Sequence, residues 1–127
     1  MKAINNKATQ IFNKLISLDK TKVQNNDSFM AVHIEMISEI KDGKIYSLAH
    51  YYEQNGDLMA DPEMEFLIKP NHLEIYPLTF RQDNLGMHQQ AVYFENGRAA
   101  KYNPRLQKDF VVFANEWLNN ISLQQSI

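Results

Sequence analysis

The residues best suited to chemistry lie in one short segment, Ala49–Phe66 (AHYYEQNGDLMADPEMEF). It holds a histidine, two tyrosines and five carboxylates, and no lysine or arginine occurs between residues 45 and 68. Carboxylates that crowd together repel one another unless a cation from elsewhere, a metal ion or solvent relieves the repulsion. This segment is therefore the first candidate for a functional site.

The residues of this segment fit either a metal site or a surface for contact with a partner. Residues 54–61 (QNGDLMAD) are predicted to be a loop, and oxygen ligands on a flexible loop suit Ca²⁺ or Mg²⁺. A metal held there would lower the pKa of a bound water, as in a hydrolase or nuclease. The candidate ligands are Glu53, Asp57, Asp61 and Glu63, with His50 beside them. The EF-hand pattern is absent, and Leu58 and Met59 within the acidic loop indicate either that the loop docks onto the protein or that it contacts a partner.

Composition narrows the class of protein. A chain of 127 residues with 44% hydrophobic residues is expected to form one domain, residues 1–127. The absence of cysteine excludes disulfides, thiolate zinc sites and thiol nucleophiles. The N-terminus lacks the apolar core of a signal peptide, and no apolar run reaches membrane-spanning length. We therefore expect a soluble, cytoplasmic protein with no membrane partner.

Charge is unevenly distributed along the chain. Residues 1–24 carry five lysines and one acid, residues 25–97 carry twelve acids and four bases, and residues 98–127 carry four bases and two acids. An acidic chain is a poor general binder of nucleic acid, because that affinity comes mainly from neutralising phosphates. Nucleic acid is thus a weaker candidate partner than a protein with a basic surface or a second copy of this chain.

Helical periodicity marks both ends of the chain. Apolar residues from Ile4 to Leu18 recur at helical spacing and predict an N-terminal helix. Near the other end, Asn103 can cap a helix and Pro104 suits its first position. The apolar stripe of this second helix consists of Leu106, Phe110, Phe113, Ala114, Trp117, Leu118 and Ile121.

Alternating apolar residues and tight turns fill the middle of the chain. Asp42-Gly43, Pro70-Asn71 and Asn96-Gly97 are turn sequences that favour antiparallel hairpins. The predicted strands are Phe29–Ile40, Ile45–Gln54, Glu63–Lys69, His72–Phe80, Gln90–Glu95 and Arg98–Tyr102. The prediction is an α+β fold: an N-terminal helix, an antiparallel meander sheet of five to six strands and a C-terminal helix, with both helices on one face.

The turns also predict a register. If Asp42-Gly43 forms the turn, Ile40 pairs with Ile45, Glu35 with His50 and His33 with Tyr52. If Pro70-Asn71 forms the next turn, Ile68 pairs with Leu73 and Glu65 with Tyr76. The predicted core face is Met30, Val32, Ile34, Met36, Ala49, Tyr51, Met64, Phe66, Ile68, Leu73 and Ile75. The predicted outer face is His33, Glu35, His50, Tyr52, Glu63, Glu65 and Tyr76. A slip of one residue would exchange the faces of a strand.

Three interpretations of this outer face remain open. The first is a solvated face, with ordinary cross-strand pairs that contribute at most about 1 kcal/mol each. The second is a partner or dimer surface, because Ile37, Leu48, Leu67 and the tyrosines would make the face half apolar. The third is a metal or acid–base site, although no HExxH or HxH spacing supports that. The ligand types for that site are His33, His50, Glu35 and Glu65.

The segment HYYEQNGDLMADPEMEF, together with FANEWLNNI at residues 113–121, resembles a family of small uncharacterised bacterial proteins. Members of that family occur on conjugative elements, in phages and as modules of larger mobile-element proteins. The resemblance extends from about Phe29 onward and implies a bacterial origin and an accessory role in a mobile element. It implies no activity and no catalytic residue.

These observations predict a non-enzymatic binding module, with a metal-dependent hydrolase or nuclease as the alternative. No catalytic residue is predicted, and no cofactor is expected unless a divalent cation binds the carboxylates. The predicted binding surface is His50, Tyr52, Glu53, Asp57, Leu58, Met59, Asp61, Glu63 and Glu65. His33, Glu35 and Tyr76 form its second tier on the sheet.

Overall fold

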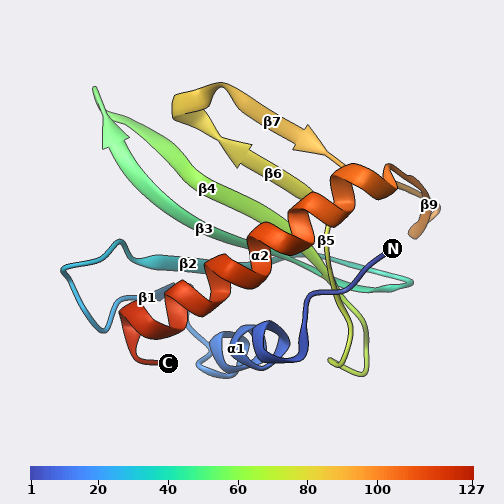
Figure 1. Cartoon of the computed structure of the whole chain (residues 1–127), viewed down its shortest axis with the longest axis horizontal. Coiled ribbons are helices and arrows are strands. Elements are labelled where there is room, and N and C mark those ends of the chain that lie inside the picture. The colour runs from blue at the N-terminus through green and yellow to red at the C-terminus, as the bar shows by residue number, and fades with distance from the viewer.

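Two helices at the ends of the chain enclose a run of nine strands in the computed structural model, which describes residues 1–127 (Figure 1). The predicted α+β class is confirmed. The elements are α1 (Asn6–Ser17), β1 (Lys22–Val23), β2 (Val32–Ile40), β3 (Gly43–Gln54), β4 (Asp57–Ile68), β5 (Ile75–Pro77), β6 (Thr79–Gln82), a 3₁₀ turn (Asp83–Leu85), β7 (Met87–Gln90), β8 (Val92–Glu95), β9 (Arg98–Tyr102) and α2 (Pro104–Gln125).

Side-chain caps start both helices. The Oδ1 atom of Asn103 accepts a hydrogen bond from the Leu106 N–H at 3.1 Å, and Pro104 is the first helical residue, as predicted. Asn5 caps α1 in the same way, accepting from the Ala8 N–H at 2.8 Å. Each cap satisfies an N–H that has no partner within its own helix.

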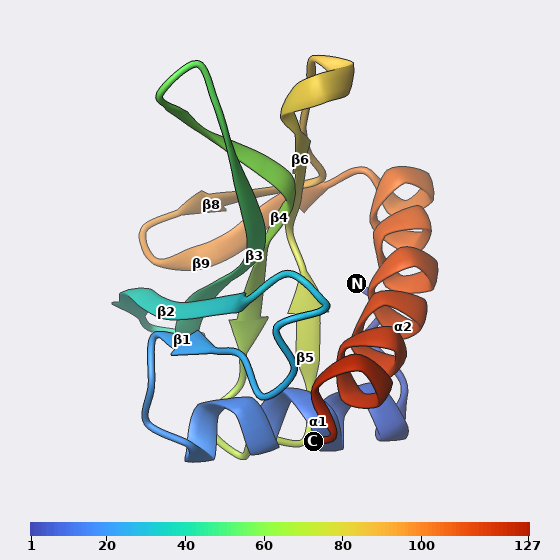
Figure 2. The ribbon, with the colours of Figure 1, turned by 90° about the vertical axis from the view of Figure 1, so that its left-hand side faces the viewer.

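The strands form an antiparallel meander in the order β1-β2-β3-β4-β6-β7, and β5 also pairs with β4. This sheet has seven strands: β1 and β7 were not predicted, and the predicted strand His72–Phe80 is divided into β5 and β6. The predicted last two strands pair only with each other, as β8 and β9. Figure 2 shows this hairpin on the opposite side of β3 and β4 from α2.

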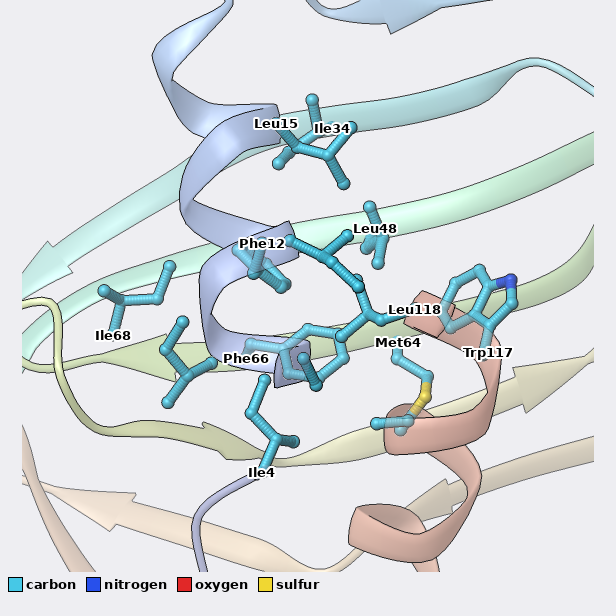
Figure 3. Packing of buried hydrophobic residues seen from close by; sticks show 14 of the residues in the cluster. Ile4, Phe12, Leu15, Ile34, Leu48, Met64, Phe66, Ile68, Trp117 and Leu118 are labelled. Carbon is cyan, nitrogen blue, oxygen red and sulfur yellow. The ribbon is translucent and has the colours of Figure 1, made fainter. Parts of the chain in front are cut away.

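Both helices cover one face of the main sheet, as predicted. The Phe12 ring of α1 packs edge-on against Phe66 of β4, with ring centroids 4.9 Å apart. On α2, Phe113 packs edge-on against Phe80 of β6 at 5.0 Å. Figure 3 shows the core between these layers, where Leu118 lies beside Phe66 and Met64. The β8–β9 hairpin covers part of the opposite face, and the rest of that face presents other side chains.

The predicted register of β2 with β3 is wrong. Ile40 pairs with Gly43, and a bulge at Ile37 shifts the register further along. Gly43 lies in the strand with φ +144°, where a Cβ would be 2.1 Å from the Ile68 carbonyl oxygen, so this contact requires glycine outside the turn. The predicted pairs Glu35–His50 and His33–Tyr52 are replaced by Glu35–Ser47 and His33–Ala49. Met36, predicted to be in the core, is exposed.

Residues 54–61 are not a loop. β3 and β4 remain paired as far as Gln54 and Asp57, and only Asn55 and Gly56 form the turn. Both turn residues have positive φ, 53° and 83°, which matches the right-handed twist of a two-residue hairpin. The carboxylates did not prevent pairing because successive residues of a strand point to opposite faces.

The register of the next connection also differs from the prediction. Ile68 pairs with Ile75 and Leu67 with Tyr76, so residues 69–74 form a longer connection. Leu73 is consequently exposed instead of in the core, and the predicted Glu65–Tyr76 pair is absent. Two leucines assigned to the outer face are fully buried. Leu48 lies beneath the helices. Leu67 lies on the opposite face, where Phe94 and Ala99 of the β8–β9 hairpin also pack against the core.

Candidate functional site

A row of polar residues crosses four strands on the face of the sheet opposite the helices. His33 pairs with Ala49, Ala49 with Glu63, and Glu63 with Arg81. Directly opposite residues share a face, so these side chains lie together, and Glu65 follows two residues beyond Glu63. We call His33, Tyr51, Glu63, Glu65 and Arg81 the polar sheet face. Glu35 lies in the adjoining row, opposite Ser47.

Tyr51 belongs to this face, although it was predicted to be in the core. His33 pairs with Ala49 rather than with Tyr52, a register change of three residues that exchanges the two faces of β3, so Ala49 and Tyr51, both predicted to be on the core face, lie on the face opposite the helices. The Tyr51 hydroxyl donates to Glu63 Oε2 at 2.5 Å, and its ring packs edge-on against His33 at 5.0 Å. Burial and this hydrogen bond raise the pKa of Tyr51 far above its usual value. Tyr51 is therefore a hydrogen-bond donor to Glu63 on this face.

Arg81 places a positive charge beside the acidic segment, which contains no lysine or arginine of its own. Its Nε donates to Asp83 Oδ1 at 2.7 Å, and it lies opposite Glu63 in the sheet. The hydrogen bond to Asp83 raises the pKa of Arg81, and the charges of Asp83 and Glu63 act in the same direction. Asp83 also accepts from the Ala60 N–H at 2.7 Å, and its pKa is lowered chiefly by Arg81. The sequence carried one signal for this role: Arg81 is the single basic residue between residues 70 and 97.

Two further groups on this face have altered proton affinity. Burial raises the pKa of Glu65, and the negative charge of Glu63 adds to the effect. Burial also lowers the pKa of His33, helped by the positive charge of Lys22. The face thus combines a hydrogen-bonded tyrosine, an arginine and paired acids, which is an arrangement suited to recognising a polar partner.

The register shift moves two predicted surface residues away from the polar sheet face. His50 is only 7% exposed; its Nδ1 is 2.9 Å from the Ala31 carbonyl oxygen and its ring packs edge-on against Trp117 of α2. Tyr52 follows Tyr51 and therefore points to the side opposite it. Tyr76 lies opposite Leu67 in the sheet, with its hydroxyl donating to Glu74 at 2.9 Å.

The β3–β4 hairpin carries the rest of the predicted surface. Figures 1 and 2 show its tip projecting beyond the body of the molecule. Leu58 is 63% exposed near this tip, Met59 is half-buried, and Glu53 and Asp57 are exposed. We call Glu53, Asp57, Leu58 and Met59 the hairpin tip.

The carboxylates proposed as metal ligands do not converge. Glu53 pairs with Leu58 while Asp57 pairs with Gln54, so the two acids point to opposite faces. Asp61 accepts a hydrogen bond from Gln82, and Glu63 accepts one from Tyr51. Nowhere in the chain do three or more histidine, aspartate or glutamate side chains form a group that could hold a metal ion. The arrangement favours separate charged contacts over a single ion site.

A protein-family model matches the whole chain. A family model described as a domain of unknown function, DUF6908, matches residues 1–127. The chain belongs to the DUF6908 family. No curated protein and no solved structure matches it. The expected membership of an uncharacterised family is confirmed, whereas bacterial origin and an association with mobile elements stay predictions for this chain. Neither helix is long and apolar enough to cross a membrane.

Proposed function

We propose that this protein is a non-enzymatic binding module that uses the hairpin tip and the adjoining polar sheet face to bind a protein with a basic surface. The observation that carries the proposal is Leu58, an exposed leucine on a projecting hairpin, close to the carboxylates of Glu53 and Asp57. An apolar anchor surrounded by charge is the arrangement that typically supplies binding energy and specificity at protein interfaces.

The hairpin presents this anchor in a defined position. β3 and β4 each contain 12 residues and stay paired to the Asn55-Gly56 turn. A segment ordered before binding loses little conformational entropy when it binds. Rigid presentation of Leu58 therefore favours recognition by the hairpin itself.

Unpaired charge supports a basic partner. The two ion pairs in the structure are Arg81–Asp83 and Arg98–Asp42, so neither Glu53 nor Asp57 has an internal cation. Free carboxylates on a projecting tip attract a positively charged surface and accelerate association at low salt. On the sheet face, Glu63 and Arg81 already have hydrogen-bond partners within the protein, so we expect this face to contribute shape and hydrogen bonds.

Photo-cross-linking in the producing cell tests this function. A photoreactive amino acid at position 58 should capture a protein that the same group at position 85 does not. Leu85 is the matched control, because it is 68% exposed at the turn of the neighbouring β6–β7 hairpin. If both positions capture the same proteins, the hairpin tip is not the specific surface.

Binding of the captured protein is then measured with purified components. We expect Leu58→Ser to weaken binding about tenfold or more, because an apolar anchor at an interface contributes more than about 1.4 kcal/mol. Leu85→Ser should bind like the parent, and Asp57→Asn should lose less affinity than Leu58→Ser. Equal losses for Leu58→Ser and Leu85→Ser would contradict the proposal. Capture of a second copy of this chain, with concentration-dependent sedimentation, would replace a basic partner by self-association.

A further inference from the structure

A cavity beside the only tryptophan lies on the helix side of the sheet, away from the polar sheet face. Its volume is about 320 Å³, and a second cavity of about 250 Å³ shares Trp117 and Asn120 with it. We call the larger one the Trp117 cavity. Its walls are formed by Phe29, Met30 and Pro62, and its polar groups include His50, Trp117 and Asn120. Cavities of this size lie at the lower end of small-molecule sites.

The indole N–H of Trp117 has no acceptor. Trp117 is 6% exposed, and its Nε1 is the one buried side-chain nitrogen or oxygen in the chain without a hydrogen-bond partner. Figure 3 shows this nitrogen on the side of the ring turned away from Leu118 and Met64. Proteins pair nearly all buried donors, and an exception calls for an explanation. An acceptor supplied by a ligand is one that fits, because Trp117 borders both cavities.

His50 places an acceptor close to this donor. A carbonyl oxygen can only accept, so the 2.9 Å contact with Ala31 puts a proton on His50 Nδ1. In the neutral ring, Nε2 is then an acceptor, and it has no hydrogen-bond partner in the protein. The centroids of the His50 and Trp117 rings are 5.5 Å apart. An unpaired donor, covered by protein, and an acceptor therefore lie on neighbouring aromatic rings in the wall of the cavity.

The charges around the cavities disfavour an anionic ligand. No lysine or arginine lines either cavity, and the one charged residue at their border is the acid Glu116. Aromatic and apolar walls favour a flat molecule that stacks between them, while the exposed Asn120 amide at the rim can both donate and accept. Nucleobases combine these properties, since an acceptor and a donor are adjacent on one edge of an uncharged ring.

We propose that the Trp117 cavity binds a small, uncharged, planar heterocycle of the nucleobase class. An acceptor of the ligand takes the Trp117 N–H, and a neighbouring donor faces His50 Nε2. Because Trp117 Nε1 is covered by protein, binding requires side chains at the rim to move. Phe29 is exposed and able to do so, while its segment is held on α2 by Gln125, which accepts from the N–H groups of Asn25 and Asn26.

Nuclear magnetic resonance of the ¹⁵N-labelled full chain tests the proposal directly. The single tryptophan gives one indole N–H signal. Adenine, cytosine and uracil are titrated up to their solubility limits, with cyclohexanol as a non-planar control and benzoate as a planar anion. We expect at least one base to move the indole signal downfield in a saturable manner, as a new hydrogen bond requires, and both controls to leave it in place.

Two asparagines on α2 provide the matched variants. Asn120 lines both cavities, whereas its neighbour Asn119 lines neither. Asn120→Ala should weaken binding of that base about fivefold, as expected for one lost hydrogen bond, and Asn119→Ala should not. The proposal is overturned if no base moves the indole signal, if a control moves it equally, or if both variants lose the same affinity. Leu58→Ser should bind the base normally, so this site and the hairpin tip are tested independently.

Discussion

Tyr51 organises the polar sheet face at the scale of single residues. Its hydroxyl donates to Glu63, which lies opposite Arg81, and its ring contacts His33. Hydrogen bonds to charged groups are stronger than those between neutral groups. One side chain thus joins β2, β3 and β4 at the point where the acids gather.

Removal of this hydroxyl should destabilise the protein. We expect Tyr51→Phe to lower the free energy of unfolding by about 1–2 kcal/mol, because Glu63 loses a charge-assisted hydrogen bond in a partly buried position. Urea denaturation measures the change. Tyr52→Phe is the matched control, since the Tyr52 hydroxyl has no partner, and it should stay within about 0.5 kcal/mol of the parent. Equal effects of the two changes would show that the Tyr51–Glu63 bond contributes nothing.

His33 should make stability depend on pH. Its pKa in the folded protein is lowered below the ordinary value of 6.5, chiefly by burial. The unfolded chain therefore takes up the proton more readily, and the free energy of unfolding should fall as pH drops through 6.5 toward the folded pKa. Urea denaturation between about pH 7 and pH 5 should show a flatter dependence for His33→Gln than for the parent.

His72→Gln is the control for this measurement, because that histidine is exposed at a turn. A slope that His33→Gln leaves unchanged would assign the dependence to other groups. Glu65 has the opposite sign, since its pKa is raised above 4.5 and its contribution is lost as pH rises through the folded value. The variant Glu65→Gln should therefore steepen the loss of stability on acidification.

At the scale of elements, the start of β3 depends on a close contact with the end of β4. A Cβ at Gly43 would be 2.1 Å from the Ile68 carbonyl oxygen, whereas one at Gly86 would meet nothing within 4 Å. Both glycines have positive φ, so an alanine is strained at either position. Backbone atoms cannot move aside as a flexible side chain can, so Gly43 has the additional steric requirement.

Alanine substitutions should separate these two effects. Gly86→Ala should cost about 1 kcal/mol for the left-handed conformation alone. Gly43→Ala should cost more than about 2 kcal/mol, because the strands must also separate locally. Thermal unfolding of both variants checks the difference, and similar losses would mean that the Gly43–Ile68 contact is easily relaxed.

The β3–β4 hairpin places Leu48 and Leu58 in different surroundings. Leu58 is exposed at the tip, while Leu48 on the same hairpin is fully buried under the helices. We expect Leu58→Ser to change the free energy of unfolding by less than about 0.5 kcal/mol. In contrast, Leu48→Ala should cost about 2–5 kcal/mol by leaving a cavity. Chemical denaturation decides this, and a large loss for Leu58→Ser would mean that the tip packs against the body of the protein.

At the scale of the whole molecule, the uneven charge of the chain is partly balanced across elements. Arg98 lies 3.6 Å from Asp42, and the Ala99 N–H donates to the same carboxylate at 3.1 Å. Lys101 stands 5.3 Å from the centre of the Tyr93 ring. Two of the four basic residues between residues 98 and 127 therefore have internal partners, whereas the carboxylates of the hairpin tip have none.

Divalent cations should not stabilise the protein selectively. The carboxylates at residues 53–63 point in different directions, so no ion can engage several of them at once. Thermal unfolding with EDTA, and then with Mg²⁺, Ca²⁺, Mn²⁺ or Zn²⁺, should give the same midpoint. A ligand at a hundredfold excess over its Kd would add about 2.7 kcal/mol. A selective increase that disappears in the double variant Asp57→Ala, Asp61→Ala would restore the hydrolase alternative.

The sequence by itself determined the features that depend on neighbouring residues. The cap at Asn103, the proline after it and the helical spacing of apolar residues identified α2, and the Asn96-Gly97 turn identified the β8–β9 hairpin. The antiparallel meander followed from the same local turn signals. These features were predictable because caps, tight turns and periodicity are satisfied within a few residues of the chain.

Only the tertiary structure decided which side chains meet. The bulge at Ile37 shifts the register of β2 with β3 by one residue and so exchanges the faces of β3, which moved Tyr51 out of the core and His50 into it. Two further contacts join parts of the chain that are distant in sequence. Gly43 lies against Ile68, and Arg81 pairs with Glu63. Strand periodicity has no marker for one extra residue, yet a shift of one residue exchanges the two faces of a sheet. The candidate segment was therefore visible in the sequence, whereas the composition of its surface depended on the packing of the whole sheet.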